Sequence, residues 1–312
     1  MRERIDSIQK QLGSQVLGTE TVVFELIAAL LSGGHVLIEG SPGVGKTTLV
    51  KSLASMVSGE FKRVQFKPDL LPSDLVGCSI YRQNEDVFEF MEGPVFCNLL
   101  LADEINRTSP RIQSALLECM NEGQVTVDGQ TRALPEMFHV IATQNNRYTT
   151  GTFPLPEPQL DRFAISIEMQ MPSAEVQVDV LKNHASQGGA VLDALMSVEE
   201  FVQVQKQVRE IKVSDAICQY IVRLCEAVRK DRALDGDLSN RASIAFLRVS
   251  QAMAYLEGHD GVFPDDVKRA MLPVLTHRLQ LSADEFGIAQ RSSQRRVIAE
   301  RLRELMKQVP VD

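Results

Sequence analysis

One segment near the start of the chain constrains the fold more than any other. It fits the pattern GxxxxGK[ST] and reads Gly40-Ser41-Pro42-Gly43-Val44-Gly45-Lys46-Thr47. A short apolar run, 35–38, precedes it, and apolar residues at helical spacing follow it. Glycines in such a loop let backbone N–H groups turn inward around phosphates, and the next helix points the positive end of its dipole at them. The segment therefore predicts a strand, a phosphate-binding loop and a helix.

The loop also predicts how the ligand is held. Lys46 is expected to reach the β and γ phosphates, and Thr47 to give its hydroxyl to Mg²⁺. Thr48 completes the predicted cofactor-binding set. A tight turn without a ligand is the alternative, but such a turn gives no reason for a lysine at this position. We expect ATP with Mg²⁺.

Two acids follow an apolar strand about sixty residues further on. The run 99–102 ends in Asp103 and Glu104, and ligands bind at the carboxyl ends of strands in open α/β sheets. Asp103 fits a Mg²⁺ partner, and Glu104 fits the group that polarises the attacking water. Two acids after a strand are otherwise most often a solvated strand end. The phosphate loop favours the catalytic interpretation.

The rest of the pattern predicts an α/β fold. Strand-like apolar runs alternate with helical or irregular stretches at 35–38, 63–66, 98–102, 138–142 and 163–168. Buried strands alternating with helices indicate a mostly parallel sheet covered on both faces. After residue 172 the periodicity is helical. We expect a nucleotide-binding domain over 1–172 and a helical domain over 173–312.

Composition limits the location and partners of the chain. A net charge of −8 over 312 residues argues against broad nucleic-acid binding. The most basic stretch, 291–307, places Ile298, Leu302 and Leu305 on one helical face, which favours a solvated amphipathic helix. Neither a membrane-spanning run nor a signal peptide stands out, so we expect a cytoplasmic protein without membrane insertion. The five cysteines lack CxxC spacing and are expected to be buried thiols.

Several motifs beyond the loop closely resemble those of the MoxR-type AAA+ ATPases. They lie at 68–74, 102–107, 114–118, 122–129, 141–145 and 155–163, and the resemblance runs from Val16 to Arg278. It implies a P-loop AAA+ core with a five-stranded mostly parallel sheet, followed by a smaller all-helical lid domain. It also implies ATP hydrolysis.

The resemblance assigns further site residues. Asn145 matches the sensor 1 position, which would contact the γ phosphate or the attacking water, although asparagine is also common in turns. Arg162 matches the finger that a neighbouring subunit inserts towards the γ phosphate, with pairing to Asp161 as the alternative. Arg241 matches the sensor 2 arginine of the lid, with simple solvent exposure as the alternative.

Three further segments follow from the same resemblance. The adenine pocket would be lined by Val16, Leu17 and Gly18, for which core packing is a competing explanation. Segment 76–90 corresponds to an insert in helix 2, and 125–134 to a hairpin before the sensor 1 strand. Asp128-Gly129 at its turn supports that hairpin independently. In related proteins such hairpins face the ring pore or a partner, but an exposed hairpin without function is equally compatible.

The sequence thus predicts an ATP-hydrolysing homo-oligomer, by resemblance a hexameric ring, that remodels or activates a protein partner. In relatives this partner commonly carries a von Willebrand A domain. A nucleotide-switched scaffold is an alternative, which the presence of Glu104 disfavours because a pure switch could lose it. A chelatase-like or nucleic-acid motor subunit is the other alternative, and the acidic balance weakens its nucleic-acid form.

Overall fold

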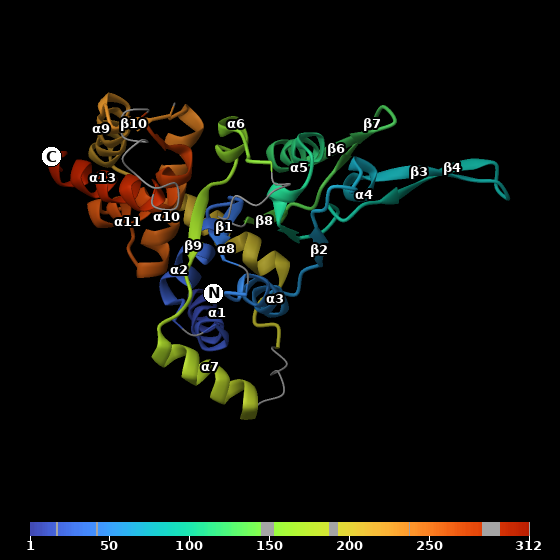
Figure 1. The fold of residues 1–312 in the computed structure, drawn as a ribbon, viewed down its shortest axis with the longest axis horizontal. Helices are drawn as coiled ribbons and strands as arrows, with labels where there is room; N and C mark the ends of the chain where they lie inside the picture. Colours follow the sequence, from blue (N-terminus) through green and yellow to red (C-terminus); the bar gives the residue numbers. More distant parts are fainter. Residues whose placement is uncertain are drawn as a thin grey trace.

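The computed structural model describes residues 1–16, 18–41, 43–144, 153–186, 193–236, 238–282 and 294–311 (Figure 1). Its main sheet has five parallel strands in the spatial order β2-β5-β8-β1-β9. Their bounds are β1 Val36–Gly40, β2 Phe61–Gln65, β5 Leu99–Asp103, β8 His139–Gln144 and β9 Ile165–Met169. The predicted α/β fold is confirmed.

Helices cover both faces of this sheet. One face packs against α1 (Arg2–Gln15), α2 (Glu20–Leu31), α3 (Lys46–Met56) and α8 (Val198–Glu210). The other packs against α4 (Pro72–Val76) and α5 (Pro110–Glu122), with the short helix η1 (Ile105–Arg107) between β5 and α5. The central strands β1, β5 and β8 are buried on both sides because they are apolar along most of their length, with polar residues near their ends.

Two hairpins leave the core on the same side (Figure 1). The longer consists of β3 (Gly77–Arg82) and β4 (Val87–Glu92), and the shorter of β6 (Gln124–Val127) and β7 (Gln130–Ala133). The turn of the shorter one has Asp128 at φ 53° and Gly129 at φ 74°, which confirms that hairpin. The predicted insert at 76–90 is also a hairpin. The guanidinium of Arg132 lies 3.8 Å from the centre of the Phe90 ring, so the two hairpins are in contact.

The remainder is mostly helical. Its elements are α6 (Glu157–Leu160), α7 (Ala174–Ser186), α9 (Asp215–Lys230), α10 (Asn240–Glu257), α11 (Pro264–Leu275), η2 (Thr276–Arg278) and α13 (Gln294–Gln308). The expectation of an all-helical second part is wrong in one detail, since β10 (Leu234–Asp235) pairs antiparallel with β11 (Gln280–Leu281). Strands of two residues are too short to show alternation. The apolar face of α13 is buried against α9 and α11, so this helix is amphipathic as predicted but not solvated on every side.

The expectation of five buried thiols is wrong for two cysteines. Cys97, Cys119 and Cys225 are buried, whereas Cys78 lies on the projecting hairpin and Cys218 on the outer side of α9. Within the described ranges, no helix is both long enough and apolar enough to cross a bilayer.

Candidate functional site

The predicted phosphate site is assembled at the carboxyl edge of the main sheet. The loop after Gly40 leaves β1 there and enters α3 at Lys46, while Asp103 is the last residue of β5, which is separated from β1 by β8. Because all five strands are parallel, their carboxyl ends share this edge. The predicted strand, loop and helix are confirmed. Three predicted site residues, Leu17, Pro42 and Asn145, lie outside the described residues.

The backbone of the loop requires glycine at two points. Gly45 caps α3 with φ 97°, a left-handed conformation that side chains disfavour. A Cβ at Gly40 would lie 2.3 Å from the carbonyl oxygen of Met169 on β9, so the loop leaves the sheet where no side chain fits. The glycine pattern therefore reflects backbone shape, as the phosphate-loop interpretation requires.

Lys46 lies between the loop and the strand ends. Its Nζ donates hydrogen bonds to the carbonyl oxygens of Gly40 at 2.7 Å and of Gln144 at 3.2 Å. Burial lowers the pKa of Lys46, and the charges of Asp103, Glu104 and Glu39 oppose this shift. Backbone carbonyls are weak partners for a buried cation, and an anionic phosphate would be a better one. Thr47 follows on the first turn of α3 and is half-buried.

Asp103 is oriented by two side chains that sequence reasoning missed. Its Oδ1 accepts a hydrogen bond from Thr143 Oγ1 at 2.6 Å, and its Oδ2 accepts one from Arg63 Nη2 at 2.7 Å. Arg63 comes from β2 and Thr143 from β8, the strands on either side of β5. For Thr143 the available signal was a polar residue near the end of an otherwise apolar strand, whereas Arg63 lies in the middle of a strand of mixed polarity. They hold the carboxylate of Asp103 in one orientation at the carboxyl edge, where it would be available as a metal ligand.

Glu104 follows in an unusual backbone conformation. Its φ of 58° is left-handed, which a residue with a side chain adopts rarely and which clusters at functional sites. The backbone N–H of Glu104 donates to Thr143 Oγ1 at 2.9 Å, and its Oε2 accepts from Arg107 Nη1 at 2.9 Å. The carboxylate of Glu104 therefore binds a different arginine from that of Asp103.

These residues fit a nucleoside triphosphate with Mg²⁺. Mg²⁺ in such sites is usually held by one or two protein oxygens, with phosphate and water as the other ligands. Thr47 and Asp103 would provide the protein oxygens, and Lys46 would provide the cation for the phosphates. Val16 lies beside the loop, because a Cβ at Gly45 would lie 3.4 Å from Val16 Cγ1. Gly18 lies near Val176 of α7, so among the described residues of the predicted adenine segment it is Val16 that borders the loop.

The two predicted arginines are found at the opposite edge of the sheet. Arg162 precedes β9 by three residues, at its amino end. It lies near the end of α5, where the carboxamide oxygen of Asn121, when turned to face it, accepts from Nε at 3.3 Å and Nη1 at 3.2 Å. Burial and the charge of Arg241 lower the pKa of Arg162, so these two guanidiniums are electrostatic neighbours.

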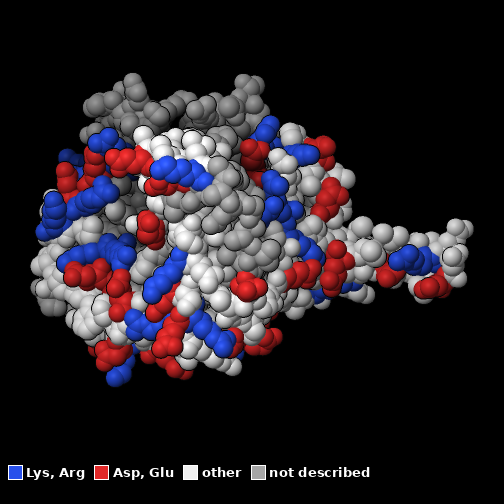
Figure 2. All heavy atoms as spheres, turned by 90° about the horizontal axis from the view of Figure 1, so that it is seen from below, with Lys and Arg blue, Asp and Glu red and all other residues white. Residues whose placement is uncertain are grey.

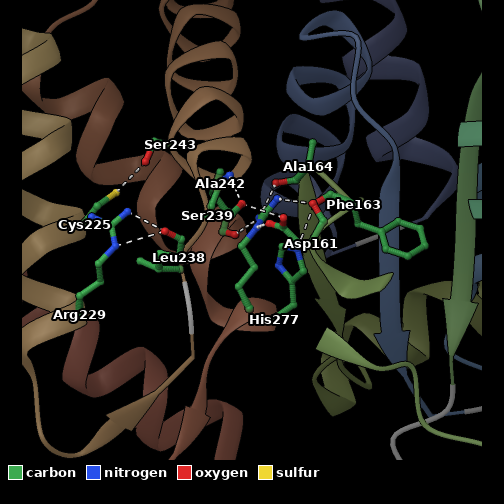
Figure 3. Close-up of polar contacts among 12 residues, drawn as sticks. Asp161, Phe163, Ala164, Cys225, Arg229, Leu238, Ser239, Ala242, Ser243 and His277 are labelled. Carbon is green, nitrogen blue, oxygen red and sulfur yellow. Dashed lines mark hydrogen bonds and ion pairs between the residues drawn. The ribbon is translucent and has the colours of Figure 1, made fainter. Parts of the chain in front are cut away.

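Asp161 is not the partner of Arg162. Its carboxylate accepts hydrogen bonds from Arg278 Nε at 2.9 Å and from Ser239 Oγ at 2.8 Å (Figure 3). Sequence reasoning missed both of these lid residues. The alternative that Arg162 serves only to neutralise Asp161 is therefore not supported by the described contacts.

Comparisons with known proteins agree with this geometry. The profile of the ATPase family associated with various cellular activities (AAA) matches residues 35–165, and that of the AAA lid domain matches 226–300. "Chaperone MoxR1" of Mycobacterium tuberculosis is 38% identical over 86% of this chain and 74% of its own. "Uncharacterized protein YeaC" of Bacillus subtilis is 44% identical over 85% of this chain and 83% of its own.

A solved structure from Cytophaga hutchinsonii, named as a "putative ATPase", superimposes with a TM-score of 0.88 at 34% identity. The two chains are covered over 100% and 96% of their lengths, respectively. Fold, phosphate loop and paired acids together define a P-loop ATPase with a lid. Within that class, the chain belongs to the MoxR-type AAA+ ATPase family.

Proposed function

We propose that the chain works as a ring of identical subunits that hydrolyse ATP with Mg²⁺ and use the energy to remodel or activate a protein partner. The observation that carries this proposal is the separation of Lys46 from Arg162. β1 alone spans four residue steps of about 3.3 Å, so roughly 13 Å of strand lies between the two edges. Arg162 therefore acts on a nucleotide bound by another subunit.

Each side chain has a role in this proposal. Thr47 and Asp103 hold Mg²⁺, Lys46 neutralises the phosphates, and Glu104 polarises the attacking water. Family resemblance gives Asn145 the sensor 1 role and places adenine against 16–18.

The position of Arg241 extends the proposal across the subunit interface. Since this guanidinium is an electrostatic neighbour of Arg162, we assign both arginines to the nucleotide of the adjacent subunit. Two cations held close together repel each other until an anion lies between them. A phosphate group supplied by the neighbour would meet that need.

The longer hairpin supports a protein partner. Its two strands expose several apolar side chains, of which Phe88 is 75% exposed. It extends well away from the ATPase core, as Figures 1 and 2 show. Exposed apolar residues gathered on a projecting element are typical of a binding site. By family resemblance we propose a partner with a von Willebrand A domain, met in the cytoplasm.

A nucleic-acid substrate has less support. On the face shown in Figure 2, acidic and basic side chains are interleaved, and the whole chain has a net charge of −8. Proteins that track a phosphate backbone usually present a continuous basic surface. The protein-remodelling proposal accounts better for this surface.

Mixing two inactive variants tests the proposal. Arg162→Ala keeps its phosphate site and loses the finger, whereas Lys46→Ala loses the phosphate site and keeps the finger. In an equal mixture that exchanges subunits, about a quarter of the interfaces combine an intact site with an intact finger. ATPase activity should then return in part. If native mass spectrometry shows mixed rings and the mixture stays inactive, Arg162 does not act between subunits.

A further inference from the structure

The lid holds the backbone on both sides of Arg162. Besides the carboxylate of Asp161, the guanidinium of Arg278 binds the carbonyl oxygens of Asp161 at 3.2 Å and Phe163 at 2.7 Å through Nη2. Its Nη1 donates to the carbonyl oxygen of Ala164 at 3.2 Å (Figure 3). Arg162 therefore stands in a short segment whose neighbours on each side are fixed by one side chain of η2.

This contact is buried. The side chain of Arg278 is 3% exposed and that of Asp161 is 20% exposed. A guanidinium has a rigid, planar set of donors, so several simultaneous hydrogen bonds define both the position and the orientation of what it holds. Disturbing one partner in such a setting is costly, because the other is left as an unpaired charge.

A second contact joins the same carboxylate to the helix that carries Arg241. Ser239 is the N-cap of α10, and its Oγ accepts from the backbone N–H of Ala242 at 3.2 Å. The same hydroxyl donates to Asp161 Oδ2 at 2.8 Å. Ser239 thus caps the helix that carries Arg241 and also binds Asp161, the residue before Arg162.

We propose that Asp161, Arg278 and Ser239 are positioning residues that couple the lid to Arg162. They set where Arg162 and Arg241 together present their charges to the nucleotide of the adjacent subunit. A shift of the lid in one subunit would change the hydrolysis rate in the next. This inference rests on the proposed action of Arg162 between subunits.

The sharpest test uses Ser239→Asp. Aspartate is also a good N-cap, so α10 should keep its start. It cannot donate to Asp161, however, and its charge repels that carboxylate. We expect ATP affinity close to that of the unmodified protein and a kcat at least about tenfold lower, since small misplacements of a catalytic group are costly. Ser214→Asp is the matched control, because Ser214 caps α9 in the same manner and is exposed.

Mixing assigns the defect. Ser239→Asp should regain activity with Lys46→Ala, whose fingers are intact, and should gain none with Arg162→Ala. A kcat unchanged by Ser239→Asp would overturn the inference. The inference would also be overturned if Lys46→Ala restored activity to Arg162→Ala but not to Ser239→Asp. If Lys46→Ala restores activity to neither variant, the proposed function is wrong and this inference with it. Should Ser239→Asp not fold, Asp161→Asn, which keeps the shape of Asp161, is judged by the same mixtures.

Discussion

The two edges of the main sheet are built in different ways. At the carboxyl edge, the loop from Gly40 to Thr47 is contiguous, and backbone N–H groups are expected to do much of the binding. At the amino edge, Asp161, Ser239 and Arg278 come from three separate elements and meet through side chains. The first arrangement is local, since its residues follow one another in the sequence. The second depends on how the lid sits, which makes it suited to carry a signal.

Removing the charge of Lys46 at the carboxyl edge should have the largest effect. Lys46→Ala is expected to weaken ATP binding by about 10²-fold or more, because charge-assisted contacts to phosphate are lost. Titration calorimetry measures this directly. Lys51→Ala, at an exposed position of the same helix, is the matched control. Equal affinities of the two variants would contradict the assigned site.

The next effect separates chemistry from binding at the same edge. Glu104→Gln keeps the shape of the side chain but removes the basic carboxylate, so kcat should fall by about 10²-fold while ATP still binds. Steady-state turnover and a nucleotide-binding assay give the two quantities. Turnover equal to that of the unmodified protein would move the role to another group.

An ion-pair contact between α13 and the strands β1 and β9 allows a test of stability. Arg295 of α13 binds Glu39 of β1, donates to Ser166 Oγ at 2.8 Å, and lies 3.8 Å from Glu168. Glu39 and Glu168 are register partners on neighbouring strands, so they repel each other without this cation. Arg295→Met should lower the free energy of unfolding by about 2 kcal/mol, somewhat less than for a fully buried pair.

Urea denaturation measures that loss, and the adjacent arginine provides the comparison. The side chain of Arg296 is 82% exposed and pairs only with Glu300 one turn away among the described contacts. Arg296→Met should therefore change stability far less. Similar losses for both variants would show that α13 does not depend on its contact with the strands.

The smallest effect concerns acid stability at the amino edge. Burial lowers the pKa of His35 to about 4 and of His139 to about 3. His35 Nδ1 accepts from the N–H of Val140, and His139 Nε2 is 2.9 Å from Gln205 Nε2, so both rings are held neutral. The unfolded chain binds protons below pH 6.5 and the folded chain does not. Stability is therefore full above pH 6.5 and falls as the pH drops towards 4.

Unfolding measured from pH 7 to pH 4.5 checks this slope. Two other groups contribute, since burial also lowers the pKa of His277 and raises that of Glu25 to about 7. Glu25 acts in the opposite direction, because its contribution is lost as the pH rises towards 7. The informative quantity is thus the difference between the unmodified protein and His139→Gln, which should show the shallower slope. Equal slopes would mean that His139 is protonated in the folded protein.

The contrast between the edges also explains what the sequence could predict. The five strands, the phosphate loop and the 125–134 hairpin were found because each has a local pattern, either apolar periodicity or a turn signal. The pair of Arg63 with Asp103 joins residues 40 positions apart, and that of Arg278 with Asp161 joins residues 117 apart. Neither pair has a local signature, because tertiary packing alone brings its members together.

Family resemblance extended the prediction where local patterns could not. It pointed to Arg162 and Arg241, and the charge of Arg241 lowers the pKa of Arg162. It did not indicate that Ser239 and Arg278 bind the residue next to Arg162. The hairpin at 76–90 was missed as a strand pair because β3 and β4 project from the core and do not show the burial alternation of a packed strand.

The longer hairpin, formed by β3 and β4, can change in length without disturbing the core. Tyr81 and Phe88 are register partners with ring centroids 5.3 Å apart, and Phe90, two residues further along β4, meets the Phe96 ring at its base. Side chains alternate between faces, so adding or removing two residues in each strand preserves this aromatic row. A change of one residue would reverse it. The hairpin can therefore lengthen, shorten or change its side chains in such steps while the phosphate loop and the lid remain as they are, so the reach and chemistry of its tip can vary independently of the nucleotide site.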